Sequence, residues 1–390
     1  MQRFQQKALL KGSFGEVAEW SIAAVLKTVV PRGTRGSNPC LSAINAENQQ
    51  IIKQTPNFTP KNVMFKNRSM KKSRRKRLVI LCIALVCIIV LVFLLFSKST
   101  SNNSTNPPLT DVLTDSISRI VSACPGEIGV AIIINNTDTV KVNDKSVYPM
   151  MSVFKVHQAL ALCNDFDNKG ISLDTLVKID RNRLDSKTWS PMMKDYSELV
   201  ISLTVRDLLR YTIAQSDNNA SNLMFKDMVN VAQTDSFIAT LIPRSSFQIA
   251  YTEEEMSADH DRAYFNYTSP LGAAMLMNRL FTESIVSGEK QSFIKNTLKE
   301  CVTGTDRIVA PLLDKERVSI AHKTGSGYVN ENGILAAHND VAYICLPNNV
   351  CYTLAIFVKD FKGNESQASQ YVAHISEVVY SLLIQNSAIP

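Results

Sequence analysis

A serine and a lysine stand three residues apart at the start of an apolar run, in the stretch YPMMSVFKVHQAL at residues 148–160. If Ser152 opens a helix, Lys155 lies about one turn later on the same face, so its amine lies beside the hydroxyl. A lysine removed from water loses its proton readily, and a neutral amine can accept the proton of a neighbouring serine. The pair is therefore typical of an activated nucleophile.

The spacing alone is weak evidence, because Ser-x-x-Lys occurs five times in the chain, beginning at Ser69, Ser73, Ser152, Ser287 and Ser292. The other four copies lie among charged or polar neighbours, where a lysine is simply solvated. Ser152 is the copy that continues as an apolar helical segment. Taken by itself, the motif fits a structural lysine as well as a catalytic one.

Two further motifs each occur once, in a fixed order. The stretch QSDNNASN places Ser216, Asp217 and Asn218 in a loop between two helical segments, and HKTGSG places Lys323, Thr324 and Gly325 on a strand that ends in glycines. Singly, the first is an ordinary turn and the second an ordinary strand end. Together with Ser152, they supply hydroxyls, amines and an amide for acyl transfer.

Ser-x-x-Lys, Ser-Asp-Asn and Lys-Thr-Gly are the motif set of class A β-lactamases and penicillin-binding proteins. From about Pro107 to its C-terminus the chain resembles the class A serine β-lactamases, and most closely the CfxA-type cephalosporinases. The resemblance implies that Ser152 attacks the lactam, that Lys155 helps remove its proton, and that Ser216 passes a proton to the departing nitrogen. It also implies an oxyanion hole from the backbone N–H groups of Ser152 and Ser326.

The resemblance assigns the rest of the substrate site as well. Asn218 would hold Lys155 and the side-chain amide of the substrate. The substrate carboxylate would be bound by charge-assisted hydrogen bonds from Lys323, Thr324, Gly325 and Ser326, with Arg307 as a supporting arginine. Trp189 matches an aromatic residue at the mouth of the cleft.

The base that activates the hydrolytic water is expected in the stretch YTEEEMSADHDRAYFNYTSP at residues 251–270. The family carries Glu-x-x-Leu-Asn in this loop, and Glu253, Met256 and Ser257 fit that pattern best. Glu254 and Glu255 are rival bases, and a merely solvated acidic loop is a further alternative.

The ion pair that usually braces this loop is absent. The resemblance implies an arginine where Tyr251 stands and an aspartate where Asn266 stands. The sequence therefore does not determine the conformation of this loop.

Helical spacing is found at residues 110–124, and two strands flank Asn135-Asn136-Thr137. Residues 152–299 are mostly helical, strands follow at 317–329 and 340–360, and an amphipathic helix spans about 364–385. We therefore expect an α+β fold over residues 110–390, with an antiparallel sheet built from N- and C-terminal segments and flanked by helices. The α/β part would take about 110–150 and 303–390, and an inserted all-α domain about 151–302.

Residues 70–96 indicate an export segment, because a basic cluster precedes nineteen apolar residues, Leu78 to Phe96. The run is long for a cleaved signal peptide and long enough to span a bilayer, so signal peptide and membrane anchor are both open. A polar linker follows at 97–109. We expect an exported, periplasmic protein that meets the membrane only through residues 78–96.

Residues 1–69 carry no resemblance to the family. The codons of Gly36-Ser37-Asn38-Pro39-Cys40 can be written to contain GGTTCGAATCC, the sequence of a transfer-RNA T-arm. We therefore interpret residues 1–69 as a conceptual translation of an upstream gene, with a disordered basic extension as the alternative.

Charge and cysteine usage exclude several classes of function. Residues 1–77 hold 16 Lys and Arg against 3 Glu, so the rest of a chain with formal charge +7 is net acidic, and nucleic acid is not an expected partner. The scattered histidines predict no metal site, and no cofactor is implied.

Cys345 and Cys351 flank Asn348 symmetrically, as opposed residues of a hairpin do, which predicts that they can form a disulfide.

We therefore expect an exported, monomeric β-lactamase that acts on cephalosporins through a serine acyl-enzyme. A penicillin-binding transpeptidase or carboxypeptidase shares the three motifs but needs no deacylating glutamate. A membrane-anchored sensor that stays acylated is the alternative from another class. Sustained turnover of a chromogenic cephalosporin distinguishes the enzyme from both.

Overall fold

The computed structural model describes residues 69–98 and 107–386. The chain divides into two units, one up to Ser101 and one from Asn102 onward. The described part of the first unit is a single helix, α3 (Ser69–Lys98). The interpretation of residues 1–69 lies outside the described residues, apart from Ser69 itself.

Within the described ranges, no helix is long and apolar enough to cross a membrane. The side chains of α3 are not described at residues 69–75, 78, 82 and 93–98. Export by residues 70–96 stays a prediction.

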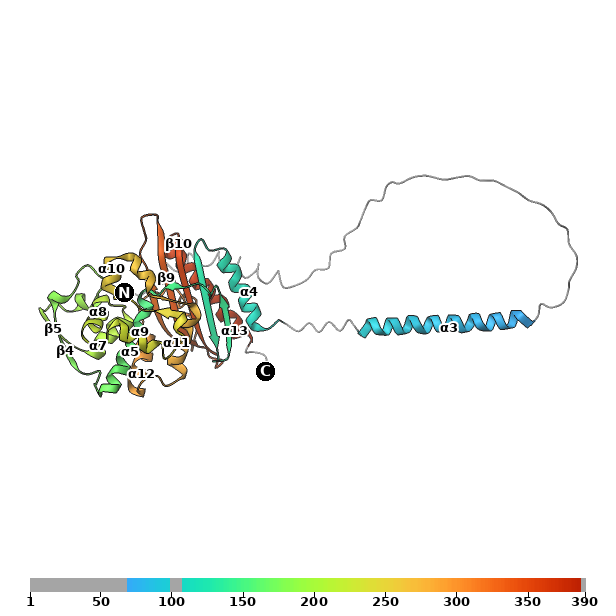
Figure 1. Ribbon diagram of the computed structural model, residues 1–390, viewed down its shortest axis with the longest axis horizontal. Coiled ribbons are helices and arrows are strands. Elements are labelled where there is room, and N and C mark those ends of the chain that lie inside the picture. Colours follow the sequence, from blue (N-terminus) through green and yellow to red (C-terminus); the bar gives the residue numbers. More distant parts are fainter. Residues whose placement is uncertain (1–68, 99–106, 387–390) are drawn as a thin grey trace. The chain divides into compact units, whose positions relative to one another are not determined.

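The second unit is built on a five-stranded antiparallel sheet in the order β2-β1-β10-β9-β8. The strands are β1 (Glu127–Ile134), β2 (Asp138–Val142), β8 (Ser319–Ser326), β9 (Ile334–Cys345) and β10 (Cys351–Lys362). Strand β1 pairs with β10, so the beginning and end of the unit lie side by side in Figure 1. The predicted α+β fold with a sheet from both terminal segments is confirmed.

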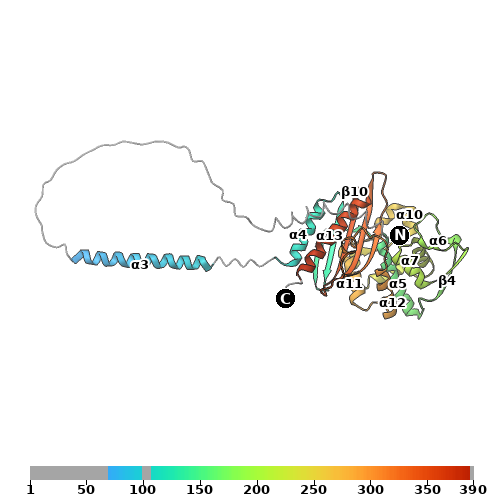
Figure 2. The same cartoon turned by 180° about the vertical axis from the view of Figure 1, so that it is seen from behind.

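Both faces of the sheet are covered, and β1 shows this in its alternation. Ile128, Val130 and Ile132 pack with α4 (Leu109–Ser122) and α13 (Glu365–Asn386). The intervening residues Ala131 and Ile133 belong to a second core with the helical block. Successive strand residues face opposite sides of a sheet, so a strand buried on both faces is apolar throughout. Figures 1 and 2 show α4 and α13 on one side of the sheet and α5 and α11 on the other.

The inserted block between β2 and β8 is mostly helical, as predicted. Its helices are α5 (Phe154–Lys169), α6 (Pro191–Asp195), α7 (Val205–Ala214), α8 (Asn218–Asp227), α9 (Val231–Ile238), α10 (Glu253–Ala258), α11 (Pro270–Thr282) and α12 (Gly288–Lys299). Short 3₁₀ turns are η1 (Met151–Val153), η2 (Arg181–Arg183), η3 (Arg244–Ser246), η4 (His260–Phe265) and η5 (Ala310–Leu312).

The block also holds two small sheets that the sequence pattern did not predict. One pairs β4 (Leu176–Asp180) with β5 (Val200–Thr204). The other has the order β3-β7-β6, from β3 (Tyr148–Pro149), β6 (Phe247–Gln248) and β7 (Tyr267–Thr268). Strands of two residues are too short for an alternating pattern to reveal them.

The predicted disulfide in the β9–β10 hairpin is confirmed. Cys345 and Cys351 are register partners, their Cα atoms are 4.1 Å apart, and their sulfurs are bonded. Opposed positions of an antiparallel pair bring Cβ atoms within the range that a disulfide needs.

Candidate active site

Ser152 lies in the tight turn where the chain leaves β3 and enters α5. It is the middle residue of η1, directly before α5 begins. Met151, just before it, adopts a left-handed backbone with φ 46°, which few residues other than glycine do. The turn is packed against β8: a Cβ at Gly325 would come within 2.3 Å of the Met150 carbonyl oxygen. Glycine at this position therefore lets the Lys-Thr-Gly strand run alongside the serine.

Lys155 is one turn further along and fully buried. Its Nζ donates to Asn218 Oδ1 at 2.6 Å and to the Ser216 carbonyl at 2.9 Å, and it lies 2.9 Å from Glu253 Oε1. Two of these partners belong to the Ser-Asp-Asn loop, and the third opens α10. The amine of the Ser-x-x-Lys motif is thus held in one orientation beside the serine.

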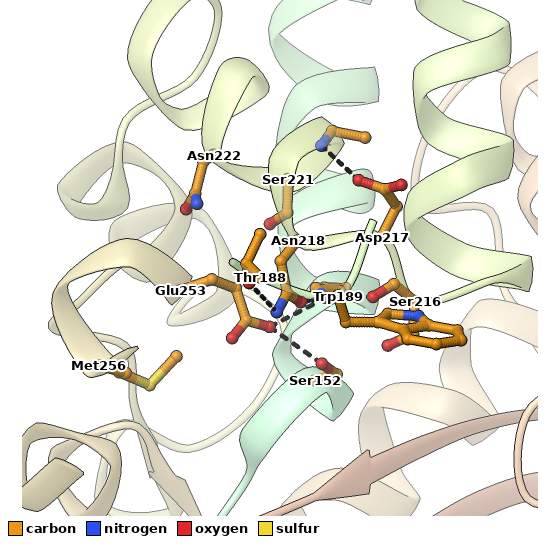
Figure 3. Close-up of polar contacts among 12 residues, drawn as sticks. Ser152, Thr188, Trp189, Ser216, Asp217, Asn218, Ser221, Asn222, Glu253 and Met256 are labelled. Carbon is orange, nitrogen blue, oxygen red and sulfur yellow. Dashed lines mark hydrogen bonds and ion pairs between the residues drawn. The ribbon is translucent and has the colours of Figure 1, made fainter. Parts of the chain in front are cut away.

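Glu253 is the acidic residue of its loop that reaches the serine. It opens α10, and its Oε1 accepts a hydrogen bond from Ser152 Oγ at 2.9 Å (Figure 3). Glu254 pairs instead with Lys226 at the surface. Glu255 closes a capping box, in which its side chain accepts from the Thr252 backbone N–H. Of the three candidates, Glu253 has the geometry of a base for this site.

The loop that carries Glu253 is braced by an amide where the ion pair was expected. Asn266 is fully buried, and its Oδ1 accepts from the backbone N–H groups of Ala250 at 2.7 Å and Tyr251 at 2.9 Å. Its Nδ2 donates to the Tyr251 carbonyl at 2.7 Å. Asn222 of α8 adds a second tie, because its Oδ1 accepts from the Glu254 N–H at 3.2 Å. An amide network at Asn266 thus takes the place of the ion pair expected between positions 251 and 266.

The Ser-Asp-Asn loop turns sharply, with Ser216 in a left-handed conformation at φ 58°. Asp217 is buried and caps α8 by accepting from the Ala220 N–H at 2.9 Å, while it also accepts from Ser190 Oγ. Burial raises the pKa of this carboxyl, and the hydrogen bonds oppose the rise. Asp217 is therefore a structural residue that presents its two neighbours to the site.

Asn218 is oriented by a second partner. Its Nδ2 donates to Thr188 Oγ1 at 2.9 Å, which leaves Oδ1 for Lys155. Trp189 lies next along the chain, 53% exposed, and its indole N–H donates to the Gln215 carbonyl. Figure 3 shows the indole near Ser216 and Asn218, as a residue at the mouth of the site would lie.

Lys323 of β8 connects this strand to the Ser-Asp-Asn loop. It is fully buried, and its Nζ donates to Ser216 Oγ at 2.9 Å and to the Thr324 carbonyl at 3.0 Å. Burial lowers the pKa of Lys323 to about 7, and the positive charge of nearby Lys155 acts in the same direction. A proton can therefore move along the contact between Lys323 and Ser216 near neutral pH.

Arg307 supports the end of β8 from behind. It is 5% exposed, and its guanidinium donates to Ser326 Oγ at 2.5 Å and to the Asn339 carbonyl at 2.7 Å. Thr324 Oγ1 lies 2.6 Å from Thr303 Oγ1. The hydroxyl of Ser326 is thus positioned by buried Arg307, and that of Thr324 by the partly exposed Thr303.

The structure brings Ser152, Lys155, Ser216, Asn218, Glu253 and Lys323 into one contact network, with Thr324, Gly325, Ser326 and Arg307 along its β8 side. Sequence reasoning missed Thr188, Asn222 and Thr303, and it noted Asn266 only as the position of a missing aspartate. Asn222 carried a usable signal, since it follows Asn218 by one helical turn. Among residues 69–98 and 107–386, no group of three or more His, Cys, Asp or Glu could hold a metal ion.

A serine whose hydroxyl contacts a carboxylate, beside a buried amine, is the arrangement of a nucleophile with its base. The model of the β-lactamase enzyme family matches residues 112–383 of this chain. The chain belongs to that family. A β-lactamase of Phocaeicola vulgatus is 83% identical over 318 residues, which is 82% of this chain and 99% of the relative.

More distant matches, in sequence and in structure, are also β-lactamases. VEB-1 β-lactamase of Pseudomonas aeruginosa is 31% identical, over 70% of this chain and 90% of its own length. The crystal structure of TLA-3 extended-spectrum β-lactamase is 31% identical, with a TM-score of 0.68 over 70% of this chain and 99% of that one. A class A β-lactamase from Bacteroides cellulosilyticus is 28% identical, with a TM-score of 0.67 over 71% and 99%. The enzyme is a class A β-lactamase, a hydrolase of the β-lactam ring that gives antibiotic resistance.

Proposed function

We propose that the enzyme hydrolyses cephalosporins through an ester on Ser152, with Glu253 as the base for its hydrolysis. The observation that carries the assignment is the 2.9 Å hydrogen bond from Ser152 Oγ to Glu253 Oε1. The preference for cephalosporins is supported by the resemblance to cephalosporinases and by relatives whose names describe extended-spectrum enzymes.

In the first half-reaction, Ser152 Oγ bonds to the lactam carbonyl carbon, and the serine proton passes to Glu253, whose Oε1 also contacts Lys155. Developing negative charge on the carbonyl oxygen is stabilised by backbone N–H groups at Ser152 and Ser326. The lactam C–N bond then breaks, and Ser216 gives its proton to the departing nitrogen. The proton held by Glu253 passes by way of Lys155, which contacts both residues, to Ser216, so Glu253 is a carboxylate again before the second half-reaction.

In the second half-reaction, Glu253 accepts a proton from a water that attacks the ester carbonyl. The bond to Ser152 Oγ breaks, and Ser152 Oγ takes the water proton back from Glu253, which restores both groups. Thr324 and Ser326 would meanwhile donate to the substrate carboxylate, and protonated Lys323 would contribute its charge.

The two alternative functions differ in this second step. A transpeptidase or a sensor keeps its acyl group until another acceptor arrives, whereas this mechanism releases it to water. The test is turnover of nitrocefin by purified protein beginning at residue 107. Product far exceeding the enzyme concentration supports the proposal, and a single burst equal to the enzyme concentration contradicts it.

We also propose that residues 70–96 direct the enzyme out of the cytoplasm into the periplasm. In the periplasm the enzyme would act as a monomer. The basic cluster followed by nineteen apolar residues supports export. Cell fractionation with N-terminal sequencing tests both export and cleavage, and light scattering tests the monomer. Enzyme found wholly in the cytosolic fraction would contradict export.

A further inference from the structure

Three ionisable side chains that take no part in hydrolysis lie together behind Thr324. Cys301 follows the end of α12, His322 precedes Lys323 on β8, and Asp340 is the register partner of Thr324 on β9. His322 Nδ1 lies 3.0 Å from Asp340 Oδ1, and Asp340 is fully buried. The Cys301 thiol interacts electrostatically with the same imidazole, so the three groups are coupled.

Asp340 determines the charge of His322. Burial alone would lower the pKa of the imidazole, but the ion pair and hydrogen bond with Asp340 outweigh it and raise the pKa to about 10. His322 is therefore an imidazolium at neutral pH. A fixed positive charge now lies beside the Cys301 thiol.

The imidazolium makes Cys301 different from the other free thiols of this unit. Burial raises the pKa of its thiol, but the hydrogen bond and charge of His322 outweigh burial and lower the pKa to about 7. Burial raises the pKa of Cys163 to about 12, and it also raises that of Cys124. Cys124 and Cys301 are both partly exposed, so Cys124 is a matched control.

Cys301 is also connected to the substrate site. Its Sγ lies 3.4 Å from Thr303 Oγ1, which in turn lies 2.6 Å from Thr324 Oγ1. The turn between them has no spare room: a Cβ at Gly304 would come within 2.4 Å of Thr324 Cγ2. A group attached to Cys301 would lie against Thr303, the residue that contacts the Thr324 hydroxyl.

We propose that Cys301 is a modification site for low-molecular-weight disulfides, and that its adduct weakens binding of the substrate carboxylate. The Cys301 thiolate attacks one sulfur of the disulfide, the new S–S bond forms, and the second sulfur leaves as a thiolate. A free thiol reverses the modification by the same exchange. No other oxidant or reductant is needed.

The first test compares the free thiols within one protein. The full chain is incubated with oxidised glutathione at neutral pH, and peptide mass mapping follows the adduct at each cysteine. Cys301 should be modified at least about tenfold faster than Cys124, because its thiolate fraction is larger. His322→Gln should remove that advantage. Equal rates at Cys301 and Cys124, or an unchanged rate in the His322 variant, would overturn the proposal.

The second test concerns function. Modified enzyme should show a KM for a carboxylate-bearing cephalosporin raised about tenfold, the size of one lost charge-assisted hydrogen bond. Mild reduction should restore it. Cys301→Ser, which keeps a hydrogen-bonding group, should retain the basal activity and resist the reagent. Equal inhibition of this variant, or a stoichiometric Cys301 adduct with unchanged KM, would refute the link to Thr324.

Discussion

Lys155 Nζ and Ser152 Oγ share one acceptor, the Oε1 atom of Glu253, at 2.9 Å each. Ser152 lies just before α5, Lys155 lies in the first turn of α5, and Glu253 opens α10. The shared contact therefore holds two separate segments of the chain beside the Ser152 hydroxyl. The serine proton can therefore pass directly to the Glu253 carboxylate. The Lys155 amine contacts the same carboxylate oxygen.

Replacing Glu253 by Gln should trap the acyl-enzyme. The amide keeps the size of the side chain but cannot accept a proton from water, and a positioned base contributes roughly 10² to 10⁴-fold. An intact mass of protein plus one opened cephalosporin should accumulate within the first turnovers. Rapid-quench mass spectrometry measures the acylated fraction over time.

Glu254→Gln and Glu255→Gln are the matched controls. Glu254 pairs with Lys226 and Glu255 caps its own helix, so neither change should trap the adduct. An adduct that accumulates in one of these variants while the Glu253 variant turns over normally would show that the base has been assigned to the wrong residue.

Asn266→Ala should loosen the loop that positions Glu253. The change leaves the backbone N–H groups of Ala250 and Tyr251 without their acceptor, and a buried unsatisfied group costs about 1 to 3 kcal/mol. We expect a lower melting temperature and slower deacylation, with acylation affected less. Thermal unfolding and single-turnover kinetics measure these effects.

Asn222→Ala is a milder comparison, because it removes one tie to the loop, the contact with Glu254 N–H. A fully stable Asn266→Ala variant with normal deacylation would show that the loop is held by other contacts.

Asn266 also illustrates what the sequence could and could not reveal. Three short motifs located the reacting groups, because each chemical role needs a particular residue type at a fixed spacing. The sheet was predictable because β1 and β8–β10 carry long apolar or alternating patterns. The sequence showed that Asn266 stands where an aspartate was expected. Its hydrogen bonds to Ala250 and Tyr251 form only when two segments of the chain come together in the fold, and no local sequence pattern predicts such a contact.

The same limit explains Thr303. It contacts Thr324 across a turn and a strand, and neither residue's neighbours predict the pairing. Spacing to Met256 and Ser257 favoured Glu253 over Glu254 and Glu255, but the contact of its carboxylate with Ser152 depends on the direction each side chain takes once α10 forms.

The pKa of Lys323 predicts a pH limit on substrate capture. Burial, together with the charge of Lys155, lowers that pKa to about 7, so the ammonium is present below this pH and is lost as pH rises through it. Because the charged form attracts the substrate carboxylate, kcat/KM should fall on the basic side near pH 7. The kcat should fall less, since a bound carboxylate favours the protonated amine.

Lys323→Arg tests this assignment, because a guanidinium stays charged throughout the range. Its kcat/KM should be lower overall, but the basic limb should move to higher pH. A basic limb at the same pH in both enzymes would assign the limb to another group.

His157 predicts a loss of stability in mild acid. His157 is a buried residue of α5, and neither nitrogen of its ring has a hydrogen-bond partner within the described residues. Burial lowers its pKa to about 4, below the ordinary value of 6.5. Between these values the unfolded chain binds a proton that the folded chain does not, so the free energy of unfolding falls as pH falls through this window.

His157→Leu should reduce that slope, by up to about 1.4 kcal/mol per pH unit. His338, whose pKa burial lowers to about 3, contributes in both proteins, so some slope remains. Denaturant unfolding of the two proteins at about pH 7.5 and about pH 5 measures the difference. The variant should lose less stability on acidification than the wild type, because leucine has no proton to exclude. Equal losses in both proteins would mean that the buried imidazole gains a compensating partner as the pH falls.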